Sequence, residues 1–184
     1  MIFSGLVMLK FQIWTICSLV LLGFITAGVL WSWHLAGQAL PRQARADTLI
    51  VVKAEHRLYL MQGNNVLKVY AVALGSGGNG PKLWRGDRKV PEGTYRIVGR
   101  NAESHFHKAL HVSYPTPSDR ASARQRQRDP GDNIMIHGPP NGLGWLGQFH
   151  KMLDWTAGCV AVTDQEIDEI WRAVPNGTRV IIRA

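Results

Sequence analysis

The sequence predicts a mainly β domain of the α+β class, with a short C-terminal helix and one N-terminal transmembrane helix ahead of the domain. Three observations lead to this prediction. Short β-rich runs separated by turn residues fill residues 47–184, a well-capped helix lies near the C-terminus, and residues 11–33 carry no charge. We therefore divide the chain into an N-terminal segment, 1–46, that ends in a short polar linker, 41–46, and a folded domain, 47–184.

Residues 11–33 form an apolar stretch that is long enough to cross a bilayer, because about 20 residues of helix span the hydrocarbon core. Trp31 and Trp33 lie near one end, where aromatic side chains anchor helices at the membrane surface. A cleaved secretory signal is the alternative, since the Ala-Arg-Ala triplet at residues 44–46 has the A-x-A form of a cleavage site. Signal peptides have shorter apolar cores, so we favour an uncleaved anchor, and either alternative exports the domain.

The chain is basic, with a formal net charge of +8, and all its acidic residues lie at or after Asp47. This excess suits an anionic envelope or polymer, and we expect no nucleic-acid partner. The arginine-rich segment 120–128 is expected to be a solvated loop or a short helix face. Two cysteines, Cys17 and Cys159, cannot make a disulfide framework, so Cys159 is the only cysteine of the domain.

Short apolar runs predict the strands at residues 48–52, 56–61, 66–74, 93–98, 109–114, 133–136 and 178–183. The Gln-Gly-Asn-Asn sequence at residues 62–65 predicts a hairpin between the second and third strands. One helix is well marked, because Thr163 and Glu166 have the spacing of a capping box and apolar residues follow at helical spacing as far as Pro175. We expect this helix to support the residues before it, which include Cys159.

Cys159 is the first candidate for chemistry. A lone cysteine is more often a small buried apolar residue than a nucleophile. However, Gly158 permits a sharp turn just before it, and the amides of Ala157, Gly158 and Cys159 could converge on a developing oxyanion.

A nucleophilic thiol needs a base, and His137 ends an apolar strand just before Gly138 and two prolines. Its imidazole would take the thiol proton and lower the thiol pKa, and a backbone carbonyl such as that of Gly138 would orient the ring. His150 is a second candidate for the base. Trp145 and Phe149 lie between His137 and Cys159 in the sequence, which suggests a lid over a cleft.

The sequence argues against two kinds of cofactor site, a zinc site and a dinucleotide site. Imidazole and thiolate are zinc ligands, but the candidate ligands match no compact zinc motif. Those candidates are His105, His107, His111, His137, His150 and Cys159. Residues 75–80 fit G-x-G-x-x-G, but Pro81 follows instead of a helix, which argues against a dinucleotide site. We therefore expect no metal and no cofactor.

The stretches around His137 and Cys159 resemble the signature of the L,D-transpeptidases, the family with the YkuD-like catalytic domain. The similar stretches are Ile136-His137-Gly138, Thr156-Ala157-Gly158-Cys159, Gly86-Asp87, Val90-Pro91-Glu92-Gly93-Thr94-Tyr95, Val112-Ser113-Tyr114-Pro115 and Gly131-Asp132-Asn133-Ile134. They follow the family's order across residues 48–183, and the sequence that ends at Cys159 resembles the branch whose motif reads D-W-T-x-G-C. The resemblance implies a YkuD-like β-sandwich.

The resemblance also implies a reaction. Cys159 would attack a peptidoglycan stem peptide as nucleophile, and His137 would be its base, oriented by the carbonyl of Gly138. The amides of Ala157, Gly158 and Cys159 would form the oxyanion hole. D-Alanine would leave from the diamino acid at stem position three, and the thioester would pass to an amine or to water. An amine acceptor gives 3→3 cross-links or attaches a protein to the wall.

The resemblance leaves the acceptor open, because Ala157 stands where many members carry histidine. Expected contacts to substrate come from Trp155, Thr156, Trp145 and Tyr114. One alternative is a hydrolase of the same fold, either an L,D-carboxypeptidase or endopeptidase, or an amidase that releases a wall-attached lipoprotein from peptidoglycan. The other is a non-catalytic wall-binding module. In each case we expect the domain in the bacterial cell envelope, outside the cytoplasmic membrane, or secreted if a signal is cleaved.

Overall fold

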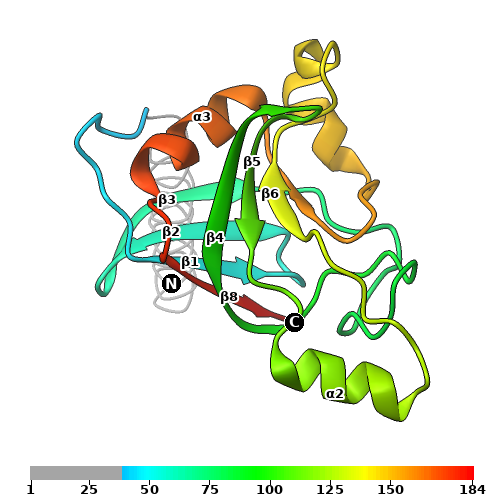
Figure 1. Ribbon diagram of the computed structural model, residues 1–184. Helices are drawn as coiled ribbons and strands as arrows, with labels where there is room; N and C mark the ends of the chain where they lie inside the picture. The colour runs from blue at the N-terminus through cyan, green and yellow to red at the C-terminus, as the bar shows by residue number, and fades with distance from the viewer. Residues whose placement is uncertain (1–38) are drawn as a thin grey trace, which may run out of the picture. The chain divides into compact units, whose positions relative to one another are not determined.

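The structure, a computed structural model, describes residues 39–184 (Figure 1). The predicted membrane segment, 11–33, and Cys17 lie outside the described residues. Within residues 39–184, no helix is long and apolar enough to cross a membrane.

The described strands form one continuous order, β3-β2-β1-β8-β4-β5-β6-β7. Their bounds are β1 Thr48–Val52, β2 Arg57–Gln62, β3 Asn65–Ala71, β4 Gly93–Ser104, β5 His107–Val112, β6 Met135–His137, β7 Val160–Ala161 and β8 Arg179–Arg183. The long strand β4 joins two halves, because its first part pairs with β8 and the part from Ile97 onward pairs with β5. In Figure 1, β4 to β6 cross in front of β1 to β3. The predictions of a mainly β fold and of a hairpin between β2 and β3 are confirmed.

The apolar core lies along these strands and follows their alternation. In β2, Leu58 and Leu60 are fully buried whereas Arg57 is exposed, and Leu110 of β5 and Ile136 of β6 are buried in the second half. Each large aliphatic side chain removed from water stabilises the fold by about 1.5–3 kcal/mol. The core therefore makes a rigid base for the strand ends that carry the site.

Two α-helices and one 3-10 helix accompany the described strands. They are α2 Pro117–Gln125, η1 Gly144–Met152 and α3 Asp164–Ala173. The helix α3 has the predicted capping box, with Thr163 bonded to the amide of Glu166 and the Glu166 side chain bonded back to the amide of Thr163. Its apolar face, which includes Ile167 and Ile170, is fully buried. The arginine-rich segment forms most of α2, which has a capping box of its own.

The segment before β1 packs on α3 and does not stand free as a spacer. Leu40 is buried, and its amide donates to Oε1 of Glu169 over 3.1 Å. The amide of Ala46 donates to the carbonyl of Ala173 over 2.9 Å. The predicted linker, 41–46, is therefore bonded to the folded domain.

Candidate active site

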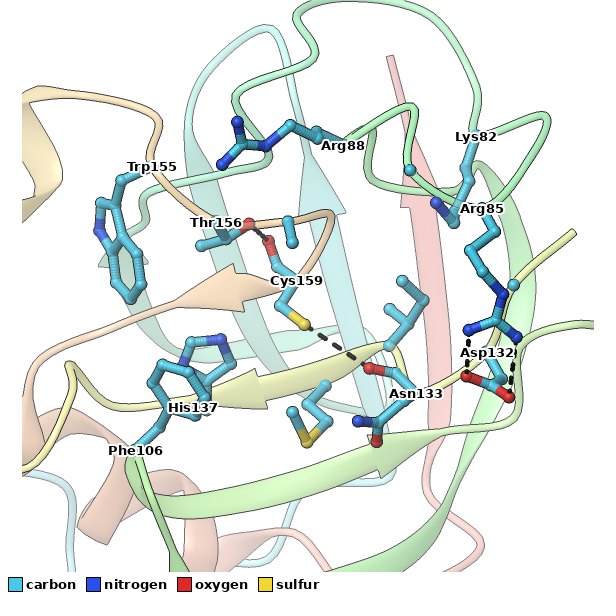
Figure 2. A pocket seen from close by; sticks show the side chains of 15 residues that line it. Lys82, Arg85, Arg88, Phe106, Asp132, Asn133, His137, Trp155, Thr156 and Cys159 are labelled. Atoms are coloured by element: carbon cyan, nitrogen blue, oxygen red, sulfur yellow. Dashed lines mark hydrogen bonds and ion pairs between the residues drawn. The ribbon is translucent and has the colours of Figure 1, made fainter.

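A cavity of about 520 Å³ lies beside the ends of β6 and β7 (Figure 2). Five of the predicted site residues line it, namely His137, Trp155, Thr156, Ala157 and Cys159. The structure thus brings together residues that lie far apart in the sequence, because β6 and β7 are parallel neighbours.

Cys159 directly precedes β7 in a turn that Thr156 holds. The Thr156 hydroxyl donates to the carbonyl of Cys159 over 2.8 Å and accepts from the amide of Gly158 over 3.2 Å. Gly158 has φ +121°, and a Cβ there would lie 2.6 Å from the carbonyl oxygen of Lys89. Only glycine fits this conformation, so the predicted sharp turn is confirmed.

The thiol of Cys159 faces the cavity and donates to the carbonyl of Asn133, with 3.7 Å between sulfur and oxygen (Figure 2). Burial raises the pKa of the Cys159 thiol, and the Met135 amide and the positive charge of Lys82 only partly oppose this. The expectation that this pKa is lowered is therefore wrong. Burial outweighs the interactions that favour the thiolate.

His137 closes β6, and its ring is almost fully buried, with 2% of the residue exposed. Its Nδ1 lies 2.6 Å from the carbonyl oxygen of Gly138. A carbonyl only accepts, so Nδ1 carries the proton and Nε2 is left as an acceptor. Burial lowers the pKa of His137 to about 4, although the Gly138 carbonyl acts in the opposite direction. Thiol and imidazole are therefore both neutral near pH 7.

Aromatic rings fix the position of the His137 imidazole. Phe106 lies against it with ring centroids 4.5 Å apart, and Trp155 meets it edge-on at 5.8 Å. The Trp155 indole N–H donates to Nδ1 of His150 over 3.4 Å. His150 is buried, contacts Trp155 and, unlike His137, does not line the cavity.

The backbone amides of the turn differ in what they bond. Because the Gly158 amide donates to Thr156, it is occupied, and the prediction of a three-amide oxyanion hole is corrected. The amides of Ala157 and Cys159 donate no hydrogen bond within residues 39–184. These two N–H groups are available to a ligand in the cavity.

A basic wall, formed by Lys82, Arg85 and Arg88, lines the cavity opposite His137 (Figure 2). Lys82 pairs with Asp87 over 2.8 Å, and both side chains are almost fully buried. Arg85 pairs with Asp129 and Asp132 at the surface. Sequence reasoning did not identify these cations, Phe106 or Asn133 as site residues. The only signal was that Gly86-Asp87 and residues 131–134 are among the stretches that resemble the family.

Three aromatic residues that were expected near the substrate lie elsewhere. Tyr114 is buried, and its hydroxyl donates to the carbonyl of Pro130 over 2.8 Å, so it packs in the core. Trp145 and Phe149 do not line the cavity and are 79% and 74% exposed. The prediction of a lid made by these two residues is wrong for this conformation.

The histidines that were weighed as zinc ligands are not gathered into one site. His107, for example, bonds Asp168 over 3.0 Å at the surface. Across the part of the chain that the structure describes, no group of three or more His, Cys, Asp or Glu side chains is arranged to hold a metal ion.

Comparison with known proteins places this site in a family. The profile of the YkuD family, described as the L,D-transpeptidase catalytic domain, matches residues 46–182. YafK of Escherichia coli strain K12 is 35% identical over 121 residues, which cover 64% of this chain and 42% of YafK. The chain thus matches less than half the length of this relative.

Two solved structures share the fold. The helical cell shape determining protein Pgp2 of Campylobacter jejuni has a TM-score of 0.56 at 19% identity, covering 84% of this chain and 54% of Pgp2. The L,D-transpeptidase of Xylanimonas cellulosilytica (residues 123–326) has a TM-score of 0.51 at 14% identity, covering 79% of this chain and 64% of that one. Given the extent of the family match and the shared fold, the chain belongs to the YkuD family and carries an L,D-transpeptidase catalytic domain.

Proposed function

We propose that this domain is a cysteine L,D-transpeptidase that acts on peptidoglycan stem peptides, with Cys159 as nucleophile and His137 as base. One observation carries the proposal. The thiol and a buried imidazole line the same cavity, and the Nδ1 proton of that imidazole is fixed on the carbonyl of Gly138. Nε2 is the nitrogen that is left to accept the thiol proton.

The first half of the reaction forms a thioester. As substrate enters, the Sγ–H turns from the Asn133 carbonyl to Nε2 of His137, which takes the proton while sulfur attacks the peptide carbonyl carbon. The amides of Ala157 and Cys159 donate to the oxyanion that develops. The imidazolium then gives its proton to the leaving nitrogen, the C–N bond breaks, and D-alanine departs.

The second half transfers the acyl group. An acceptor amine attacks the thioester carbonyl, its proton passes to Nε2, and the C–S bond breaks to restore the thiol. Water in place of the amine gives hydrolysis. Because the starting pair is neutral, charge develops on the thiolate and imidazolium only as the reaction proceeds.

The basic wall supports a stem-peptide substrate. Stem peptides carry carboxylates, and the wall places three cations at the cavity, of which Lys82 and Arg85 are paired with aspartates. Arg88 is the member of this wall for which no ion pair is formed within residues 39–184, so it is the cation most available to a substrate carboxylate.

The proposal is tested by incubating the full chain with muropeptides that carry tetrapeptide stems and identifying the products by mass spectrometry. We expect loss of D-alanine and new 3→3 links from the wild type, and neither from Cys159→Ser or His137→Ala. D-Alanine loss without links would assign the hydrolase alternative. If the folded wild type gives no product at all, both the transpeptidase and the hydrolase function are contradicted, and a wall-binding module is favoured.

We also propose that residues 11–33 anchor the chain in the cytoplasmic membrane, with the catalytic domain in the envelope. The uncharged length of this stretch and its flanking tryptophans support the anchor. N-terminal sequencing of the protein extracted from membranes tests it. A sequence that begins at Met1 agrees with the anchor, and one that begins just after Ala46 assigns a cleaved signal.

A further inference from the structure

One short segment exposes an unusual amount of apolar surface. We call residues 143–153 the apolar turn; it comprises η1 and one residue on each side. Its exposed side chains, with their exposed fractions, are Leu143 40%, Trp145 79%, Phe149 74%, Met152 75% and Leu153 77%. Among the described residues, only Val66, Trp84 and Val98 are comparable, and they are scattered. Several exposed apolar side chains gathered in one short segment are typical of an interaction site.

The shape and chemistry of the apolar turn fit a lipid surface. In Figure 1 it is the gold coil that projects beyond the strands at the top. It does not line the cavity, and it contains no acidic residue. Trp, Phe, Met and Leu side chains on a projecting turn are suited to insertion between lipid headgroups, where Trp is favoured.

The apolar turn lies close to the point where the described chain begins. Gln148 and Lys151 of η1 bond the carboxylate of Glu166, and Leu40 bonds that of Glu169. Glu166 and Glu169 lie three residues apart on α3, where side chains are neighbours about 5–6 Å apart. The same helix therefore holds both the apolar turn and the entry of the chain into the domain.

Few residues separate the described chain from the segment that we propose as the membrane anchor. Residues 34–38 separate that segment from Ala39, and five residues reach at most about 18 Å when fully extended. The entry point, and the apolar turn beside it, would thus stay within reach of the lipid headgroups.

We propose that the apolar turn docks into the surface of the membrane in which the chain is anchored, an inference that rests on the proposed anchor. Docking would hold the domain in one orientation on the bilayer. Because Leu153 is followed closely by Trp155, which lines the cavity, docking would also fix where the cavity faces.

The test uses the full chain in vesicles of phosphatidylethanolamine and phosphatidylglycerol that contain a phospholipid with a diazirine in its acyl chain. After irradiation, lipid adducts are mapped to peptides by mass spectrometry. We expect adducts on residues 11–33 and on the apolar turn. Trp145→Ser/Phe149→Ser/Leu153→Ser should lower the adducts on the turn by about tenfold or more, since burying one large apolar side chain already shifts an equilibrium by about that factor.

The matched control is Val66→Ser/Val98→Ser, which removes exposed apolar side chains elsewhere and should leave the adducts on the turn unchanged. Adducts confined to residues 11–33 would overturn the docking proposal and leave the anchor standing. Adducts on neither segment would overturn both. The readout needs no catalysis, so these outcomes are independent of the transpeptidase proposal.

Discussion

The two side chains at the centre of the site are neutral in the resting protein, because burial, complete for His137 and partial for Cys159, disfavours the charged form of each. Burial disfavours the thiolate of Cys159 and the imidazolium of His137 alike, so neither charge is present before a substrate arrives. Sequence reasoning predicted the opposite for the thiol, because it could place a histidine near a cysteine but could not weigh the burial of each. A neutral pair protects the thiol from reactions with other electrophiles.

Alkylation of the Cys159 thiol measures its protonation state directly. We expect the rate of reaction of Cys159 with iodoacetamide to rise with pH and to show its inflection above about 8.5, the ordinary cysteine pKa. The adduct is quantified by intact mass across a pH series on the folded protein. An inflection below pH 8 would mean that a thiolate–imidazolium pair already exists in the resting site.

Thr156 holds the turn that presents the thiol, since its hydroxyl bonds both Gly158 and Cys159. Thr156→Val removes both bonds and leaves buried backbone groups unpaired, so we expect a loss of about 1–3 kcal/mol in the free energy of unfolding. Turnover of muropeptides should fall with it. Thr156→Ser keeps the hydroxyl and should restore most of both quantities; if it behaves like Thr156→Val, the hydrogen bonds are not the cause.

Among the helices, α3 is the support of the site, because it begins shortly after Cys159 and buries its apolar face in the core. Thr163→Ala removes the cap and should lower the free energy of unfolding by about 1 kcal/mol, measured by urea denaturation. Thr116→Ala removes the equivalent cap from α2, whose only fully buried residue is Ala123. It should cost less, and a larger loss from Thr116→Ala would contradict the view that α3 is the more important support.

The elements that could be predicted are those whose signal is local. The β-rich apolar run of β1 and the capping box of α3 appear directly in the sequence, and the structure matches both. The strand β4 extends beyond its prediction to Ser104, because its second half is held by pairing with β5 and not by its own apolar residues. Long-range pairing of this kind leaves little trace in a short window of sequence.

The site residues, like the helices and strands, were predictable where their signal is local in the sequence. His137, Cys159 and their glycine neighbours carry a local motif, and the structure places both side chains in one cavity. Phe106 and Lys82 reach the cavity from distant loops, and only the packing of those loops brings them there. Trp145 looked like a site residue by its place in the sequence, although its side chain points into solvent.

For the protein as a whole, the buried pair of Lys82 and Asp87 joins the basic wall to the rest of the fold. Burial alone would raise the pKa of Asp87, but the hydrogen bonds from Lys82 and from the amides of Leu83, Lys89 and Trp84 outweigh it and lower the pKa. A lowered folded-state pKa contributes stability that is present above the unfolded value of about 3.9 and lost as the pH falls through the folded value.

Asp87→Asn should therefore lower the free energy of unfolding at pH 7 by about 3–5 kcal/mol, because it leaves the Lys82 charge buried and unpaired. The difference from wild type should shrink as the pH falls below about 4, as followed by urea denaturation across that range. Asp132→Asn breaks only an exposed pair with Arg85, which solvent screens, and should cost far less. Equal losses for the two variants would show that the buried pair has no special role.

The most direct measurement is the mass of the intact protein after brief mixing with a tetrapeptide-stem muropeptide. The account predicts a covalent adduct on Cys159 that equals the muropeptide less D-alanine, formed by the wild type and absent from Cys159→Ser. Release of D-alanine by the Cys159→Ser variant at the wild-type rate, or an adduct on another residue, would contradict it.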